Sequence, residues 1–213
     1  MPLNLIDNMG SGFSKYDHKE TGQSRYCYPE TDVLINKENI RNAKALAAYE
    51  ADITILRQYE LEKEQVVKGR FGTTHLKRIH QYIFQDIYPF AGKYRIENIT
   101  KGSTTFCRSE FIQVNLERIL GELKNDRYLK GLEERKFADK AAYYMSEINM
   151  IHPFREGNGR TIREFIRQLA FYSGYSINWS LIDRATLLNA TIAAVDKDYK
   201  PLSACIQKVI GKE

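Results

Sequence analysis

One stretch of this sequence limits its fold more than any other: Ile151 to Arg163, which reads IHPFREGNGRTIR. Apolar residues recur at helical spacing on both sides of it, whereas the stretch itself holds one proline and two glycines. Pro153 disfavours α-helical geometry at the residue before it, and glycine allows the backbone to turn sharply. The pattern therefore predicts two helices joined by a short polar loop.

The two helices beside this loop are predicted together with their inward faces. The first runs from Glu133 to Met150, and the second runs from Thr161 to Tyr172, with Gly174 in the position of a C-cap. The first helix is expected to bury Phe137, Ala141, Tyr144, Met145 and Ile148.

Five further helices are predicted wherever apolar residues recur every three or four positions. They begin near Asn36, at Thr73 or Thr74, at Ser109, at Asp183 and at Pro201. Asn36, Ser109 and Asp183 are the expected capping residues. The expected inward stripe of the first helix is Leu46, Tyr49, Ile53 and Leu56, and that of the third is Ile112, Leu116, Ile119, Leu120 and Leu123.

The second of these helices is expected to end at Tyr88, where Pro89 stops it. It carries His75 and His80, which lie five residues apart and so do not share one face. They are interpreted as surface or partly buried polar residues rather than as a metal-binding pair.

In residues 89–107, apolar residues no longer recur at helical spacing. Their β-branched and aromatic residues surround a turn signal at Lys101-Gly102-Ser103, which makes this segment the best β-hairpin candidate in the chain. A plain connecting loop is the alternative. Residues 1–35 show no period and are interpreted as an irregular leader, whose Tyr16, Tyr26 and Tyr28 could pack on a core. The predicted fold class is mostly α: one helical domain, residues 36–213, with a small hairpin.

Length and composition argue against several classes of protein. A chain of 213 residues fills one core with at most a small appendage. Its net charge of +5 is spread along the chain, unlike the basic patch of a nucleic-acid-binding protein. No secretory signal or membrane-spanning run is visible. Cys27, Cys107 and Cys205 form no C-x-x-C pair, which argues against a disulfide framework or zinc site and favours a cytoplasmic location.

The central loop has the composition of an anion site. Gly157, Asn158 and Gly159 lie just before a helix, where unpaired backbone amides and the helix dipole attract negative charge. Arg160 and Arg163 are about one helical turn apart, so their guanidinium groups can face the same di- or triphosphate.

Two residues of the loop can carry chemistry. Glu156 is badly placed to bind phosphate directly but is a suitable Mg²⁺ ligand beside phosphate oxygens. His152, at the end of the preceding helix, is a suitable general base for a hydroxyl. Phe154 is interpreted as an apolar anchor. On physical grounds alone, a plain polar turn between two helices explains the same residues about as well.

The segment from His152 to Arg163 resembles, without a mismatch, the signature HPFx(D/E)GNGRxxR of Fic-domain proteins. The resemblance extends to PFAGKYR, from Pro89 to Arg95, which looks like the start of the family's flap. About residues 35 to 210 therefore resemble one Fic fold, in which the predicted hairpin is the flap that positions a target protein.

The resemblance implies AMP transfer from ATP to a Tyr, Thr or Ser hydroxyl of a target protein. His152 would be the base, and Glu156 would hold Mg²⁺ between the α- and β-phosphates. The nucleotide would be bound by Lys101, Gly102, Gly157, Asn158, Gly159, Arg160 (β-phosphate) and Arg163 (γ-phosphate). The target would pair with the flap residues Thr100, Ser103, Thr104, Thr105 and Phe106 by β-augmentation.

The family also implies how such a chain is regulated. Many members are inhibited by a helix carrying (S/T)xxxE(G/N), whose glutamate pairs with the arginine at the position of Arg163. Here the only Glu-Gly or Glu-Asn pairs begin at Glu38, Glu97 and Glu156, and none has Ser or Thr four residues earlier. A separate small antitoxin is therefore the expected inhibitor. The chain looks most like the toxin–antitoxin branch and related bacterial effectors, for which delivery into a host cell is an alternative location.

Other activities stay open. A Fic fold can transfer UMP, phosphocholine or phosphate, or serve as a catalytically idle binding module. The kinase branch of the family replaces the second glycine of the loop with lysine, so Gly159 argues against phosphate transfer. Intact His152 and Glu156 argue against an idle module.

Overall fold

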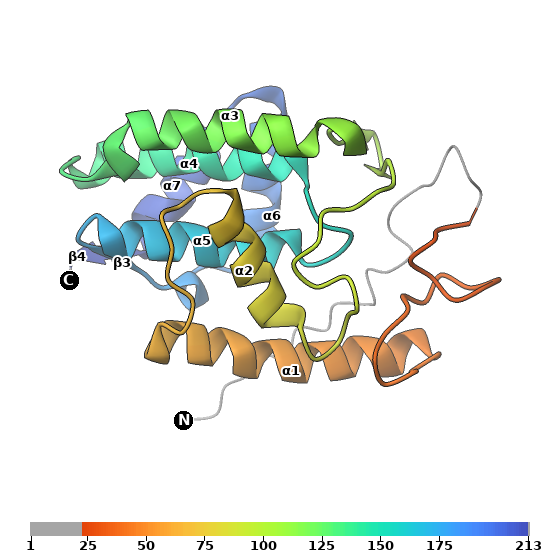
Figure 1. Ribbon diagram of the computed structural model, residues 1–213. Helices are drawn as coiled ribbons and strands as arrows, with labels where there is room; N and C mark the ends of the chain where they lie inside the picture. The colour runs from red at the N-terminus through yellow and green to blue at the C-terminus, as the bar shows by residue number, and fades with distance from the viewer. Residues whose placement is uncertain (1–22, 213) are drawn as a thin grey trace.

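The computed structural model describes residues 23–212, so the expectation for Tyr16 lies outside the described residues. Within that range the chain is mostly α-helical, as predicted (Figure 1). The helices are α1 (Ala43–Glu64), α2 (Thr73–Phe84), α3 (Ile112–Asn125), α4 (Glu134–Ile151), α5 (Asn158–Tyr172), α6 (Arg184–Ala193) and α7 (Lys200–Val209).

Helix α4 is the centre of the bundle and packs against α3, α5 and α7. Helix α2 crosses α5 and packs against both α5 and α1. Helix α1 forms one edge of the molecule (Figure 1). The inward residues predicted for α3 and α4 are all buried, so apolar spacing alone identified the faces of these two helices.

The predicted hairpin is present, as strands β1 (Thr100–Lys101) and β2 (Thr104–Thr105) in antiparallel register. A second antiparallel pair, β3 (Tyr175–Ile177) with β4 (Ile210–Lys212), was not predicted. Each of these strands is only three residues long and its partner is distant in sequence, so neither alternation nor a turn signal indicates the pairing.

The first helix begins later than predicted. Asn36 does not cap it: the side chain of Asn36 bonds the backbone of Leu34 and Ile40, which closes a turn before the helix. Asn42 is the cap, accepting a hydrogen bond from the backbone N–H of Ala45. Both asparagines satisfy a capping pattern in sequence, and only the tertiary packing selects the second.

The predicted apolar stripe of α1 is also partly wrong. Leu56 is 52% exposed, whereas the buried residues of this helix are Leu46, Glu50, Thr54 and Leu61. Two polar side chains thus occupy inward positions, and both contact the central loop.

Smaller differences concern helix ends. Helix α2 stops at Phe84, and the chain turns through Ile87 before Pro89. Ser109 does not cap α3 with its side chain but opens a 3₁₀ turn, Ser109–Phe111, that leads into it. Asp183 caps α6 as predicted, by accepting from the backbone N–H of Thr186. Pro201 lies in the first turn of α7, where its missing N–H costs nothing.

Residues 23–42, the described part of the segment before α1, pack on the core. Cys27, Tyr28, Val33 and Leu34 are buried, and Cys27 pairs with Leu34 in an isolated β-bridge. The three cysteines are free thiols. In the part of the chain that the structure describes, none of the helices combines the length and the apolar character needed to cross a membrane.

Candidate functional site

The loop from His152 to Gly157 connects α4 to α5, as predicted, and it reverses the direction of the chain (Figure 1). His152 leaves the helical region with a φ of +48°, which ends α4 directly before Pro153. Gly157 has a φ of +80°, and a Cβ at this position would collide with the ring of Phe84. Only glycine allows the loop to lie this close to α2.

Asn158 closes the loop with its side chain. It accepts a hydrogen bond from the Phe154 N–H at 2.9 Å and donates one to the Phe154 carbonyl at 2.7 Å. Phe154 is fully buried, which confirms it as an apolar anchor. Helix α5 begins at Asn158 itself, three residues before the predicted start, so the first amides of the helix belong to the loop.

His80 supports this loop from α2, a role that the sequence did not predict. Its Nδ1 accepts a hydrogen bond from Gly92 N–H at 2.8 Å, so Nε2 carries the proton and donates to the Glu156 carbonyl at 3.0 Å. Its ring stacks on Phe154 at 3.8 Å. His80 is 0% exposed and His75 is 3% exposed, so placing them at or near the surface was wrong.

A signal for His80 was present in the sequence. Leu76, His80 and Phe84 follow one another at intervals of four, which puts the histidine in the apolar row of α2. A polar residue in such a row needs a hydrogen-bonding partner when it is buried, and here the partner is the loop backbone.

His152 is also a buried imidazole, 7% exposed. Its Nδ1 lies 3.0 Å from the Asn149 carbonyl, which can only accept, so Nδ1 carries the proton and Nε2 the lone pair. Burial lowers the pKa of His152 to about 3, and the charges of Arg95 and Lys101 act in the same direction. The ring of Phe106, at the end of the hairpin, stacks on His152 at 3.9 Å. His152 is therefore a neutral imidazole under the edge of the hairpin.

Arg95 ties the hairpin to the loop. This guanidinium is 2% exposed and donates to the carbonyls of His152 at 2.8 Å and Glu97 at 2.6 Å, and also to that of Cys107. Its own backbone N–H donates to the Pro153 carbonyl at 2.9 Å. In the sequence Arg95 is visible only as the last residue of PFAGKYR, whereas in the structure it joins two parts of the site.

Charged groups of the loop and of the first turn of α5 lie against α1. Arg160 Nη2 lies 2.6 Å from Glu50 Oε1 and 3.7 Å from Glu156 Oε1, and its Nη1 donates to Thr54 at 3.2 Å. Glu156 Oε1 accepts from the Gly157 N–H at 2.9 Å. Burial raises the pKa of Glu156, and the nearby Glu50 carboxylate raises it further.

The remaining predicted residues border the same region. Gly159 is exposed at the start of α5, and a Cβ there would lie 3.3 Å from a guanidinium nitrogen of Arg163, which therefore folds back beside it. On the hairpin, Thr100 and Phe106 are buried and Thr104 is half-buried, whereas Lys101, Gly102, Ser103 and Thr105 are exposed. Exposed strand residues leave the hairpin accessible to another chain.

The chemistry of the loop fits a magnesium ion. Among residues 23–212 no three His, Cys, Asp or Glu side chains gather into a site that could hold a metal unaided. Mg²⁺ does not need such a cage, because one or two carboxylates, waters and substrate phosphates usually suffice. A bound cation would also relieve the repulsion between Glu156 and Glu50 that raises the Glu156 pKa.

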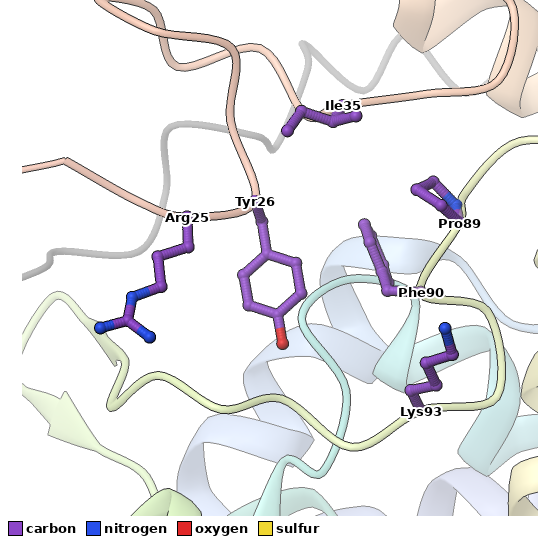
Figure 2. A pocket seen from close by; sticks show the side chains of 6 residues that line it. All are labelled: Arg25, Tyr26, Ile35, Pro89, Phe90 and Lys93. Carbon is purple, nitrogen blue, oxygen red and sulfur yellow. The ribbon is translucent and has the colours of Figure 1, made fainter.

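A small hollow of about 210 Å³ lies outside this loop (Figure 2). Tyr26 and Phe90 form its aromatic wall, with ring centroids 5.2 Å apart, and Arg25 and Lys93 stand on either side of them. None of its lining residues belongs to the segment from His152 to Arg163, so it is separate from the candidate site.

Comparison with known proteins gives consistent matches. Residues 70–170 match the Fic/DOC family. The protein adenylyltransferase VbhT of Bartonella schoenbuchensis is 36% identical over 189 residues, which cover 89% of this chain and 39% of VbhT. Fic of Escherichia coli K12, described as a probable protein adenylyltransferase, is 34% identical over 191 residues, covering 90% of this chain and 94% of that protein.

Solved structures agree on the fold. The N-terminal Fic domain of a Bartonella quintana effector translocated by a VirB system, determined with bound ADP, superimposes with a TM-score of 0.82. It is 26% identical, and the match covers 88% of this chain and 95% of that one. The type IV secretion effector BepA is 30% identical with a TM-score of 0.78, covering 87% of this chain and 68% of that one.

Proposed function

The chain belongs to the Fic/DOC family, and from that premise we propose that it is a protein adenylyltransferase. It would move AMP from ATP to a Tyr, Thr or Ser hydroxyl of a target protein and release pyrophosphate. Relatives named as protein adenylyltransferases cover most of this chain, and the structure of one relative holds ADP.

The observation that carries the proposal is the state of His152. Its Nδ1–H is bonded to Asn149, which leaves the lone pair on Nε2. In the reaction the target oxygen attacks the α-phosphorus, its proton passes to Nε2, and the bond to the oxygen bridging the α- and β-phosphates breaks. The electron pair of that bond leaves with pyrophosphate. His152 therefore needs no prior deprotonation to act as the base.

The other residues of the loop would bind and orient ATP. The amides of Gly157, Asn158 and Gly159, at the start of α5, would bind the phosphates, that of Gly157 in exchange for its bond to Glu156, with Arg160 on the β-phosphate and Arg163 on the γ-phosphate. Glu156 would hold Mg²⁺, which when bound would neutralise phosphate charge. Most of the catalysis would then come from positioning and charge neutralisation.

The hairpin would provide both nucleotide and target contacts. Lys101 and Gly102, at its turn, would contact the nucleotide. An extended target segment would add to the strands at Thr100 and at Ser103, Thr104, Thr105 and Phe106, through backbone hydrogen bonds. The ring of Phe106 already covers His152 and would guide the acceptor hydroxyl past it.

Isotope labelling tests the reaction. Incubation of the chain and a candidate target with ATP labelled on the α-phosphate should label the target protein, and His152→Ala should abolish the label. ATP labelled on the γ-phosphate should give none. Label only from the γ-phosphate would indicate a kinase and overturn the proposal; label from UTP or CDP-choline instead would indicate transfer of UMP or phosphocholine. Label from none of them would favour the idle binding module.

A small antitoxin is proposed as the regulator. The 213-residue sequence contains no (S/T)xxxE(G/N) motif, and in the proposed regulation a separate small protein places a glutamate on Arg163. The chain expressed alone should then arrest growth of its host cell, whereas His152→Ala should not. Purified alone, the chain should be active without further treatment. If the isolated chain binds ATP but neither arrests growth nor transfers AMP, regulation by a separate protein is contradicted.

A further inference from the structure

Helix α1 turns two polar side chains toward the loop between α4 and α5. Glu50 is 7% exposed and Thr54 is 1% exposed, whereas the apolar Ile55 and Leu56 beside them face solvent. Glu50 and Thr54 are four residues apart, so they share one face of the helix. Burying a carboxylate is costly unless it is paired, and here the pairing is with the candidate site.

Glu50 and its neighbours hold Arg160 from outside the loop. Glu50 Oε1 accepts a hydrogen bond from Arg160 Nη2 at 2.6 Å, and Glu50 Oε2 accepts one from the hydroxyl of Tyr88. Thr54 Oγ1 accepts from Arg160 Nη1 at 3.2 Å. The ring of Phe84 lies 4.8 Å from the guanidinium carbon. A carboxylate, a hydroxyl and an aromatic face thus fix the orientation of the guanidinium.

This arrangement orients the Arg160 guanidinium but does not use all of its N–H donors. A guanidinium has five N–H donors. The hydrogen bonds recorded among residues 23–212 use two of them, one to Glu50 and one to Thr54. Donors therefore remain for an anionic ligand of the loop.

Glu50 also decides which carboxylate Arg160 pairs with. The same Nη2 lies 2.6 Å from Glu50 and 3.7 Å from Glu156. Glu156 is one helical turn before Arg160, a spacing at which a glutamate and an arginine form an ion pair readily. Glu50 makes the closer contact with this nitrogen, so the Arg160–Glu156 pair stays open at 3.7 Å instead of closing to hydrogen-bond distance.

We propose that Glu50 is a positioning residue of the site: it aims Arg160 at the β-phosphate and prevents the guanidinium from closing onto Glu156. The proposal rests on the proposed function, because it assumes that Arg160 meets the β-phosphate of ATP. Replacing Glu50 by glutamine keeps its size but removes its charge, so Arg160 turns toward Glu156 and away from the phosphate.

Nucleotides that differ in the β-phosphate test this role. Calorimetric titration with ATP, ADP and AMP in the presence of Mg²⁺ should show roughly tenfold weaker binding of ATP and ADP to Glu50→Gln. AMP has no β-phosphate, so its affinity should not change. In a chain that already carries Arg160→Ala, adding Glu50→Gln should have no further effect on any of the three nucleotides.

Helix α1 supplies a matched control. Glu60 accepts hydrogen bonds from Tyr82 at 2.8 Å and from Arg57 at 2.9 Å, so it has the same two partner types ten residues further along the helix. Ten residues correspond to roughly 15 Å of helix. Glu60→Gln should leave all three affinities at the wild-type value, whatever it does to stability.

Three results would overturn the role of Glu50. Equal loss for AMP and ADP would indicate general damage to the fold, unchanged ADP binding would indicate no role, and tighter ADP binding would make Glu50 a competitor of the phosphate. In each case the wild type still binds nucleotide, so the proposed function stands. Binding of none of the three nucleotides by the wild type would overturn the proposed function, and this role with it.

Discussion

At the scale of single residues, His80 and His152 show that burial decides what an imidazole does. Both are neutral because burial lowers the pKa of each to about 3. The proton of His80 bonds the carbonyl of Glu156, and that of His152 bonds the carbonyl of Asn149. One ring thus supports the loop, and the other presents a lone pair to the proposed reaction.

These low pKa values predict acid sensitivity. The unfolded chain protonates histidine near pH 6.5, whereas the folded chain resists protonation until about pH 3. The free energy of unfolding should therefore be highest above pH 6.5 and fall by about 1.4 kcal/mol per pH unit for each such histidine below it. His80→Gln should be less stable at pH 7.5 and should lose less stability between pH 7.5 and 5, as measured by urea unfolding. Parallel losses in both proteins would mean that His80 is protonated in the folded state.

At the scale of elements, the sequence predicts what local spacing determines. The inward faces of α3 and α4 followed from apolar periodicity, and the hairpin followed from a turn signal between β-branched residues. The start of α1 did not follow from the sequence, because Asn36 and Asn42 are both plausible capping residues. Glu50 and Thr54 were missed because their partner, Arg160, is more than 100 residues away. Within the loop the motif identified the residues, but not their supports on α1, α2 and the segment before the hairpin.

The joint between the hairpin and the loop can be tested through Arg95. Arg95→Lys keeps the charge but loses the planar fork that reaches several carbonyls at once, so buried acceptors lose their donors. We expect a loss of about 2–3 kcal/mol in unfolding free energy and faster hydrogen exchange in the hairpin. Arg108→Lys is the matched control, because Arg108 is exposed and its guanidinium pairs with the exposed Glu110 at 2.8 Å. Equal effects of the two substitutions would show that Arg95 does not hold the hairpin.

At the scale of the whole molecule, the helical bundle places distant segments around one short loop. Helix α2 contributes His80 and Phe84, helix α1 contributes Glu50, and the segment before the hairpin contributes Arg95. Single-sequence patterns cannot show such convergence: they can mark a residue as unusual, as they mark His80 in the apolar row of α2, but they do not identify its partner in a distant segment. The resemblance to a family supplied the chemistry of the loop, whereas the folded chain supplies the reason why the loop holds its shape.

Residues 23–42, which precede α1, take part in this packing, although their sequence shows no helical or strand period. Leu34 is 0% exposed and lies in the same core as the helices. Leu34→Ala should therefore leave a cavity and lower the free energy of unfolding by about 2–5 kcal/mol in urea unfolding. Leu181→Ala is the control, because Leu181 is 58% exposed and its truncation should cost less than about 0.5 kcal/mol. A Leu34→Ala chain as stable as the control would show that the helices fold without this segment, so that the catalytic unit begins only at α1.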